Sequence, residues 1–188
     1  MSERADPDLD MVFRLRQGDE DALREIIRRY QGPIHDFAFR MLGTATRAED
    51  AAQEVFVRVN SRIASFRPDR GLFSTWIFQI ARNTAIDELR RRKHDPIHAA
   101  DEIENDHAAR SPSPTEQLAQ KEIGHAIATA MADLPEDQRT AIALAEYHDL
   151  SYAEIAAIMD CSEKSVEARI YRAKEKLRKH LREFLKEG

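Results

Sequence analysis

The chain has 188 residues, a length that suits one compact domain or two small ones. It carries 29 Lys and Arg against 34 Asp and Glu, so its formal net charge is -5, whereas a self-sufficient nucleic-acid-binding protein is typically basic overall. No apolar run approaches the ~20 residues of a membrane span, and the first ten residues lack an apolar signal core. A single cysteine, Cys161, excludes an intramolecular disulfide. These features predict a soluble cytoplasmic protein with no membrane insertion.

Apolar residues recur at spacings of three and four along most of the chain, and no useful stretch alternates as a strand does. The sequence therefore predicts an all-α protein. The first helical block covers about residues 8–41, with an interruption expected near Gly32-Pro33, where proline removes a backbone donor. A turn at Gly43-Thr44 precedes a second helix at about residues 47–63. The stripe of this helix that we expect to be buried consists of Ala51, Val55 and Val59.

Residues 65–71 predict a loop, because Pro68 and Gly71 punctuate them. A long helix follows from residue 73 to about residue 93, and it ends in a basic run at 90–93. Its predicted buried stripe consists of Phe73, Ile77, Ile80 and Thr84.

Residues 94–116 differ in composition, with three prolines, several acids and almost no large apolar residue. Such a composition cannot bury enough surface to offset the entropy of ordering. We therefore expect a flexible linker at 96–114 between a domain at 1–95 and a second domain at 115–188.

Four titratable residues in or beside this linker raise the question of a metal site: His94, His98, Asp101 and His107. On a helix the first two would lie close enough to share a metal ion. Because proline interrupts the segment, we expect no metal and no cofactor. The chain also lacks a P-loop, a nucleophile elbow and an H-E-x-x-H motif, so nothing indicates an enzyme.

The second domain is predicted to contain four helices. The first covers about residues 115–132, and the second begins at 134–137 with proline and two acids in its first turn. Ser151 and Glu154 have the spacing of a capping box, which predicts the start of a third helix that ends near residue 159. After a tight turn at Asp160-Cys161, the last helix runs from Ser162 to about residue 186.

The last two helices have the pattern of a helix-turn-helix over residues 150–181. Small and apolar residues are available to pack one helix across the other: Ala153, Ile155, Ala156, Ile158 and Met159 on the first, and Val166, Ile170 and Ala173 on the second. Between Lys164 and Arg182, eight basic residues against two Glu give a local charge of +6, which attracts phosphates. The alternative is a solvated helix face with surface ion pairs.

A recognition helix presents its N-terminal residues to base edges in the major groove. Here these residues are Glu163, Lys164, Glu167 and Ala168, with Tyr171 and Arg172 one turn further. Glu167 is unexpected next to phosphates. Two roles remain open for it, since its carboxylate can accept a hydrogen bond from cytosine N4 or discourage non-specific binding to DNA. We expect Cys161, in the turn, to be a small buried residue.

On the predicted helix at 47–63, a polar surface lies away from the apolar stripe. It consists of Asp50, Gln53, Glu54 and Val57. A rigid acidic and amide surface suits a basic protein partner, although exposed acids also occur with no partner at all.

Four motifs follow one another along the chain: Asp50-x-x-Gln53-Glu54, then Phe73-Ser-Thr-Trp76-Ile-Phe-x-Ile80-Ala-Arg-Asn83-x-Ala-x-Asp87-x-Leu-Arg90-Arg91, then Leu134-Pro-x-x-x-Arg139, and Leu150-Ser-Tyr-x-Glu154-Ile-Ala. In this order and spacing they resemble the extracytoplasmic-function (ECF) group of bacterial sigma factors. The resemblance covers about residues 8–95 and 115–182. It implies two helical domains, called regions two and four, with no region three between them.

The resemblance also implies roles for individual residues. In the family, region two docks on the coiled-coil clamp of the largest catalytic subunit of RNA polymerase, and region four lies against the flap. The matching core-polymerase-binding residues here are Asp50, Gln53, Glu54 and Val57. The residues matching −10 promoter recognition are Ser65, Phe66, Arg67, Asp69, Asn83, Asp87, Arg90 and Arg91. Those matching −35 recognition are Glu163, Lys164, Ser165, Glu167, Ala168, Arg169, Tyr171, Arg172 and Lys176.

The family's loop before the long helix captures a flipped base of the non-template strand. Flipping a base costs a few kcal/mol, and stacking on an aromatic ring offsets ~1–3 kcal/mol of this. Phe66, flanked by Arg67 and Arg70, is chemically suited to that role. Phe73, Trp76 and Phe78 are expected in the core instead.

The sequence thus predicts an initiation factor that binds RNA polymerase core, recognises −35 and −10 elements, promotes DNA opening and performs no catalysis. An anti-sigma protein is an expected further partner. Two alternatives remain: an ordinary helix-turn-helix regulator, which would bind paired half-sites without polymerase, and a helical enzyme with an appended DNA-binding module.

Overall fold

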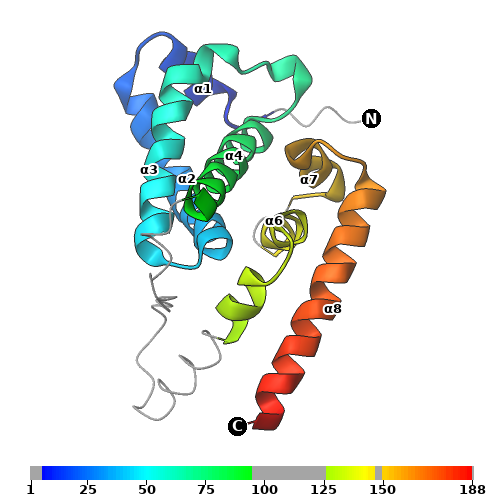
Figure 1. The fold of residues 1–188 in the computed structure, drawn as a ribbon. Helices are drawn as coiled ribbons and strands as arrows, with labels where there is room; N and C mark the ends of the chain where they lie inside the picture. The colour runs from blue at the N-terminus through cyan, green and yellow to red at the C-terminus, as the bar shows by residue number, and fades with distance from the viewer. Residues whose placement is uncertain (1–5, 95–125, 147–149, 188) are drawn as a thin grey trace, which may run out of the picture.

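The computed structural model describes residues 6–94, 126–146 and 150–187, and every regular element in these ranges is a helix (Figure 1). The first group of helices consists of α1 (Leu9–Arg16), α2 (Glu20–Leu42), α3 (Ala45–Arg62) and α4 (Phe73–His94). The second group consists of a helical stretch at 126–132, α6 (Glu136–Ala145), α7 (Tyr152–Met159) and α8 (Glu163–Glu187). The prediction of an all-α fold is confirmed.

The break in the first helical block lies at residues 17–19, and the predicted interruption near Gly32-Pro33 is wrong. Gly18 takes a left-handed conformation with φ 87°, and Asp19 caps α2 by accepting the amide hydrogen of Asp21 at 2.9 Å. Helix α2 continues through Pro33. Its buried side chains on both sides of the proline, including Tyr30 and Ile34, outweigh the one lost hydrogen bond.

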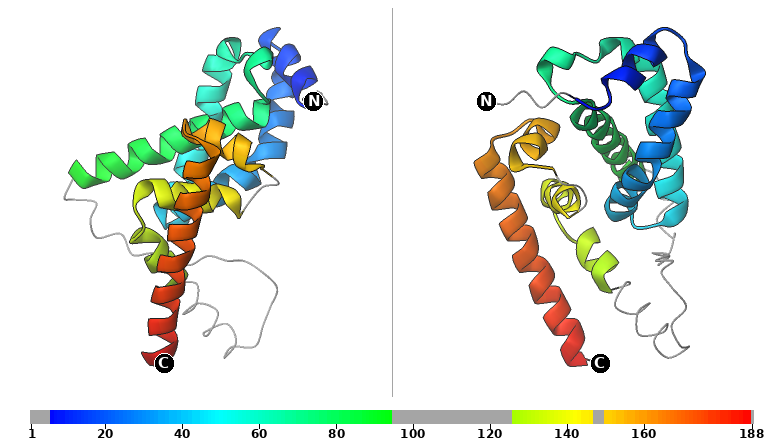
Figure 2. Two further views of the ribbon diagram at one scale, coloured as in Figure 1. Left: turned by 90° about the vertical axis from the view of Figure 1, so that its right-hand side faces the viewer. Right: turned by 180° about the vertical axis from the view of Figure 1, so that it is seen from behind.

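Helix α4 is enclosed on more than one side. Its predicted stripe is buried as expected, and Phe78, Ala81 and Ala85 are buried as well. Helices α2 and α3 pack against α4 on one side, and α7 packs against it from the second group (Figure 2). The predicted stripe of α3 is also buried.

The two groups of helices share one apolar core and are joined by polar contacts. The Arg139 guanidinium donates to the carbonyl oxygen of Met41 at 2.9 Å, and the Gln79 amide donates to the carbonyl oxygen of Ala157 at 2.9 Å. Burial lowers the pKa of Arg139. Helix α8 lies beyond α6 and α7, on the side away from α1–α4 (Figures 1 and 2).

The helix-turn-helix forms as predicted. The side chain of Ser151 accepts from the backbone of Glu154, whose carboxylate accepts from the backbone of Ser151, so the capping box is complete. Asp160 ends α7 in a left-handed conformation with φ 51°, and the hydroxyl of Ser162 accepts from the backbone of Ser165 at 3.3 Å. The predicted packing residues are buried except one, because Ala153 lies in the first turn of α7 on its exposed side.

Several predictions fall outside the described residues. These are the linker at 96–114, the first part of the helix at 115–132, and the candidate metal ligands His98, Asp101 and His107. The domain boundaries therefore stay predictions. Within the described ranges, no helix is both long and apolar enough to cross a membrane.

Asp160 gives a test of the turn geometry. A left-handed residue with a Cβ costs roughly 1–2 kcal/mol, and aspartate offsets part of this through its short polar side chain. We expect Asp160→Ala to lower the free energy of unfolding by about 1 kcal/mol and Asp160→Gly to leave it unchanged or higher. Urea denaturation followed by circular dichroism measures both. Equal stabilities of the two variants would contradict the left-handed turn.

Candidate nucleic-acid and polymerase interfaces

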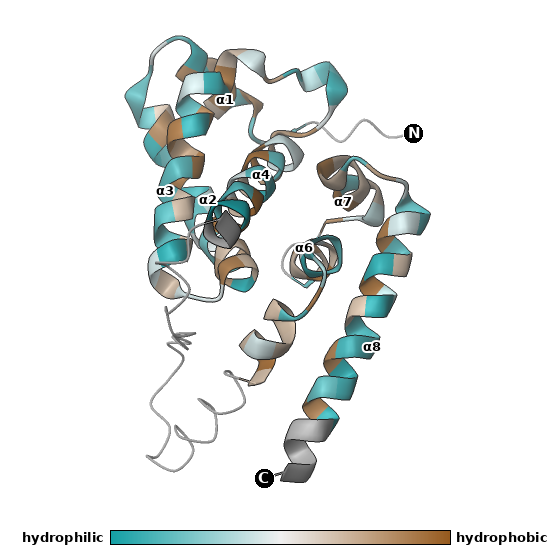
Figure 3. Ribbon diagram, in the orientation of Figure 1, coloured by the Kyte–Doolittle hydropathy of each residue, from teal (hydrophilic) through white to brown (hydrophobic). Residues whose placement is uncertain are grey.

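The outer surface of α8 carries most residues predicted to read duplex DNA. Glu163, Lys164, Glu167, Arg172 and Lys176 are exposed, and Tyr171 has 66% of its surface accessible. The opposite side of the helix holds the buried packing residues, and Figure 3 shows α8 as largely hydrophilic with hydrophobic residues at intervals. The helix therefore presents a continuous polar and basic face.

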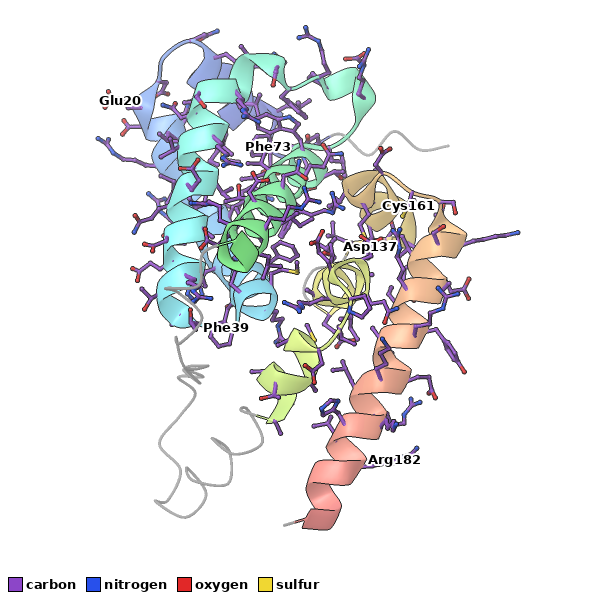
Figure 4. All side chains as sticks on the ribbon, in the orientation of Figure 1. Glu20, Phe39, Phe73, Asp137, Cys161 and Arg182 are labelled. Carbon is purple, nitrogen blue, oxygen red and sulfur yellow. The ribbon has the colours of Figure 1, made fainter. Side chains whose placement is uncertain are left out.

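Three residues predicted on that face have protein contacts. Arg169 donates to the carboxylate of Asp137 at 2.8 Å and to the sulfur of Cys161 at 3.0 Å, so it links α6 to the turn of the helix-turn-helix (Figure 4 labels both partners). Ser165 bonds to Ser162, and Ala168 is half-buried. Cys161 is partly buried and packs against the core, so its predicted burial is partial.

The polymerase-facing surface predicted on α3 is exposed at Asp50, Gln53 and Val57, the last with 63% of its surface accessible. Buried alanine and valine residues fill the other side of the helix. Gln53 also borders a groove of about 560 Å³ between α2 and α3, together with His35 and Phe56. This surface is therefore presented by a helix that packing holds firmly in place.

A second groove, of about 1050 Å³, lies between α3 and α4. It brings together residues predicted for polymerase binding, Asp50 and Glu54, and residues predicted for the −10 element, Asp87, Arg90 and Arg91. Within it Arg58 pairs with Glu54 at 2.7 Å and with Asp87 at 3.2 Å.

Arg58 was not among the predicted site residues. The Glu54 carboxylate, which accepts its hydrogen bond, raises the pKa of the Arg58 guanidinium. The spacing of four between Glu54 and Arg58 is a signal for a helical ion pair, but nothing local indicates the partner Asp87 on α4. Arg58 thus connects the two predicted surfaces across the groove.

The loop between α3 and α4 contains two short 3-10 helices, Ile63–Ser65 and Pro68–Arg70. Ser65, Arg67 and Asp69 are exposed, as their predicted role requires. Phe66 is only 2% exposed, and its ring packs edge-on against Phe73 with 5.6 Å between centroids. In this arrangement the ring is packed in the core, and its predicted stacking on a base stays a prediction.

The adjacent cavity is bordered by Phe66 and by Trp76, which is half-buried and lies 5.6 Å from the ring of Phe66. The cavity measures about 270 Å³, and its walls include Arg67, Gln79 and Ala157 of α7. Phe73 and Phe78 are buried, so their predicted core positions are confirmed, and Figure 4 labels Phe73 where α4 begins.

The remaining −10 residues lie along α4. Asn83 and Asp87 are exposed. Arg90 lies 3.8 Å from Glu136 of α6, and Arg91 pairs with Glu88 at 2.7 Å. Both arginines remain more than half exposed, so their guanidinium groups are accessible to phosphates.

Comparisons with known proteins match both halves of this architecture. Residues 26–94 match the family model of Sigma-70 region 2, and residues 124–177 match that of Sigma-70, region 4. The RNA polymerase sigma-H factor of Pseudomonas aeruginosa is 35% identical over 188 residues, which cover 96% of this chain and 97% of the relative. The ECF RNA polymerase sigma factor SigW of Bacillus subtilis is 34% identical, and the match covers 92% of this chain and 96% of the relative.

The chain belongs to the ECF group of the sigma-70 family. It is therefore a sigma factor, which recognises promoters and initiates transcription with RNA polymerase. The assignment favours this function over the helix-turn-helix regulator and the helical enzyme, since the matched relatives are sigma factors.

Solved structures share the fold of this sigma factor. The structure of CnrH in complex with the cytosolic domain of CnrY has a TM-score of 0.67 and 27% identity, and it covers 93% of this chain and 96% of that chain. The sigma factor RpoE of Bartonella quintana, solved with the anti-sigma factor NepR, has a TM-score of 0.63 and 24% identity. The match covers 85% of this chain and 96% of that chain. The second likeness concerns the fold alone.

The buried ring of Phe66 makes a prediction about the stability of the sigma factor. Phe66→Ala should lower the free energy of unfolding by about 3–5 kcal/mol, because it leaves a cavity beside Phe73 and Trp76. The control Val57→Ala, at an exposed position, should stay within about 0.5 kcal/mol of the wild type. Urea denaturation measures both variants. A Phe66→Ala protein as stable as the wild type would place the ring outside the core.

Proposed function

We propose that this sigma factor uses three separate surfaces, as its sequence predicts. The exposed side of α3, with Asp50, Gln53 and Val57, binds the clamp of the largest polymerase subunit. The exposed acids and amide on a helix whose other side is buried support this assignment. Glu54 contributes through its pairing with Arg58, which fixes the carboxylate at the edge of the same surface. The chain itself performs no catalysis, and polymerase makes the RNA.

The −10 surface consists of the α3–α4 loop and the exposed side of α4. Ser65, Arg67 and Asp69 contact the opened strand, and Asn83 reads it from α4. Phe66 and Trp76 both line the loop cavity, and the half-buried Trp76 is the more accessible of the two rings. Stacking on an aromatic ring contributes about 1–3 kcal/mol per base, which is the scale needed to offset unstacking.

The −35 surface is the outer side of α8. Its first exposed turn, with Glu163, Lys164 and Glu167, reaches base edges, while Arg172 and Lys176 meet phosphates. Arg169 acts indirectly, by holding the turn through Asp137 and Cys161. The net charge of -5 limits binding to DNA in the absence of polymerase.

The two groups of helices separate on the promoter. The −10 and −35 elements lie about 25 base pairs apart, or roughly 85 Å at about 3.4 Å per base pair along one strand. A compact chain of this length has a radius of gyration of only about 16 Å. The contacts of α7 with α4 and of α6 with α2 must therefore open before both surfaces reach their elements.

An anti-sigma protein is the partner proposed for the factor when it is inactive. Support comes from CnrH, a relative of similar fold that was solved in complex with the cytosolic domain of another protein. Since polymerase and promoters are the targets, the factor acts in the cytoplasm.

Reconstituted transcription tests the proposed function. Purified chain and core polymerase are incubated with a promoter library randomised at the −35 and −10 positions, and the transcripts are sequenced. We expect start sites that depend on the chain and share two motifs with fixed spacing. Transcripts that are the same with and without the chain would overturn the function.

Charge reversal tests the α3 surface. Asp50→Arg should weaken binding to core polymerase at least about tenfold, a change of about 1.4 kcal/mol, because it places a cation against a basic surface. Asp36→Arg, at an exposed position of α2, is the matched control with the same change in charge. Fluorescence anisotropy of labelled factor gives both affinities, and circular dichroism confirms the fold. Equal loss in the two variants would mean that net charge alone is responsible.

A further inference from the structure

The segment before α2 contacts both ends of the loop that is proposed to read the −10 element. This N-terminal segment, residues 6–16, lies outside the matched family model, which begins at residue 26. It comprises a turn at residues 6–8 and α1. Its contacts with the loop come from Arg16 at one end and Asp6 at the other.

Arg16 holds the start of the loop. Its Nε donates to the carbonyl oxygen of Ile63 at 3.2 Å, and a second guanidinium nitrogen donates to the carbonyl oxygen of Phe66. Its guanidinium also lies 5.8 Å from the ring of Phe13 and 6.0 Å from that of Phe66. Carbonyls at the end of a helix lack partners within the helix and attract cations, and the planar fork of arginine reaches two of them at once.

Asp6 holds the end of the loop. Its Oδ2 accepts the backbone N–H of Phe73 at 2.6 Å, which caps the first turn of α4 from a distant part of the chain. Asp6 in turn accepts the N–H of Asp8 at 3.0 Å. Asp8 is buried, pairs with Arg29 at 3.0 Å and accepts a hydrogen bond from Tyr30. The segment is thus anchored on α2 while it contacts the loop.

We propose that Arg16 and Asp6 are positioning residues for the −10 loop. They fix residues 63, 66 and 73, so the exposed side chains between them, above all Arg67 and Asp69, start from a defined backbone. This inference rests on the proposed role of the loop. A displacement of about 1 Å in such a site is enough to reduce its activity strongly.

Tryptophan fluorescence tests the positioning without DNA, because Trp76 is the single tryptophan of the chain and lies beside Phe66. In Arg16→Gln, we expect the emission maximum to shift to longer wavelength and acrylamide quenching to increase. Arg16→Lys, which keeps the positive charge but lacks the planar guanidinium, should give a smaller change in emission and quenching. The matched control is Arg14→Gln on the same helix, whose ion pairs are to Asp19 at 2.8 Å and Glu25 at 3.1 Å.

Strand binding tests the consequence for function. Polymerase holoenzyme containing each variant is titrated with a single-stranded oligonucleotide of the −10 motif found in the library experiment, and with a −35 duplex. We expect Arg16→Gln and Asp6→Ala to weaken binding of the single strand about tenfold, while affinity for core and for the duplex stays the same. Asp10→Ala, at an exposed position of α1, should change neither.

The outcomes separate this inference from the proposed function. Unchanged Trp76 fluorescence in Arg16→Gln, or equal loss of strand binding in the Arg14 and Arg16 variants, would overturn the positioning role. If the wild-type holoenzyme ignores the −10 strand while Trp76 still responds to Arg16→Gln, the function proposed for the loop fails and the positioning stands. If Arg16→Gln does not fold, Arg16→Lys and Asp6→Ala provide the same comparisons.

Discussion

The enclosure of α4 is the constraint on which the other features of this sigma factor depend. Helices α2 and α3 bury one side of it and α7 contacts another, so that among its described side chains the exposed ones form a narrow strip with Asn83, Asp87, Arg90 and Arg91. The same packing holds α3 at a fixed angle beside α4, and Arg58 spans the groove between them. The surfaces proposed for polymerase and for the −10 element are therefore parts of one rigid body.

Local signals account for what the sequence predicted well. Apolar spacing placed the boundaries of α3, α4 and α7 within about two residues, which is the usual uncertainty of helix ends. The capping box at Ser151 and the tight turn at Asp160 depend on neighbouring residues alone. The break between α1 and α2 was missed because the proline at 33 carries the stronger local penalty. In the folded chain, burial along α2 outweighs that penalty.

The residues of the candidate sites also fall into those that local signals predict and those that they do not. The exposed sides of α3 and α8 follow from their apolar stripes, since whatever is not buried must face outward. Apolar stripes do not predict the positions of Phe66, Arg58 and Arg169, because each of these side chains contacts a distant part of the chain. Because it contains a proline, a glycine and arginines, the loop around Phe66 is expected from its sequence to be fully exposed. In the structure, the ring of Phe66 instead packs in the core and attaches the loop to it.

The two groups of helices meet through a shared apolar core and through a few polar contacts. Gln79 and Arg139 donate to backbone carbonyls across the interface. The neutral amide contributes about 0.5–1.5 kcal/mol through such a bond and the charged guanidinium about 1.5–3 kcal/mol. When the groups part, Arg139 keeps its hydrogen bonds to the carbonyls of Ala132 and Leu134 within its own group. The guanidinium therefore stays partnered in both arrangements. This arrangement suits the proposed separation of the two DNA-binding surfaces, because opening leaves the Arg139 guanidinium with hydrogen-bond partners.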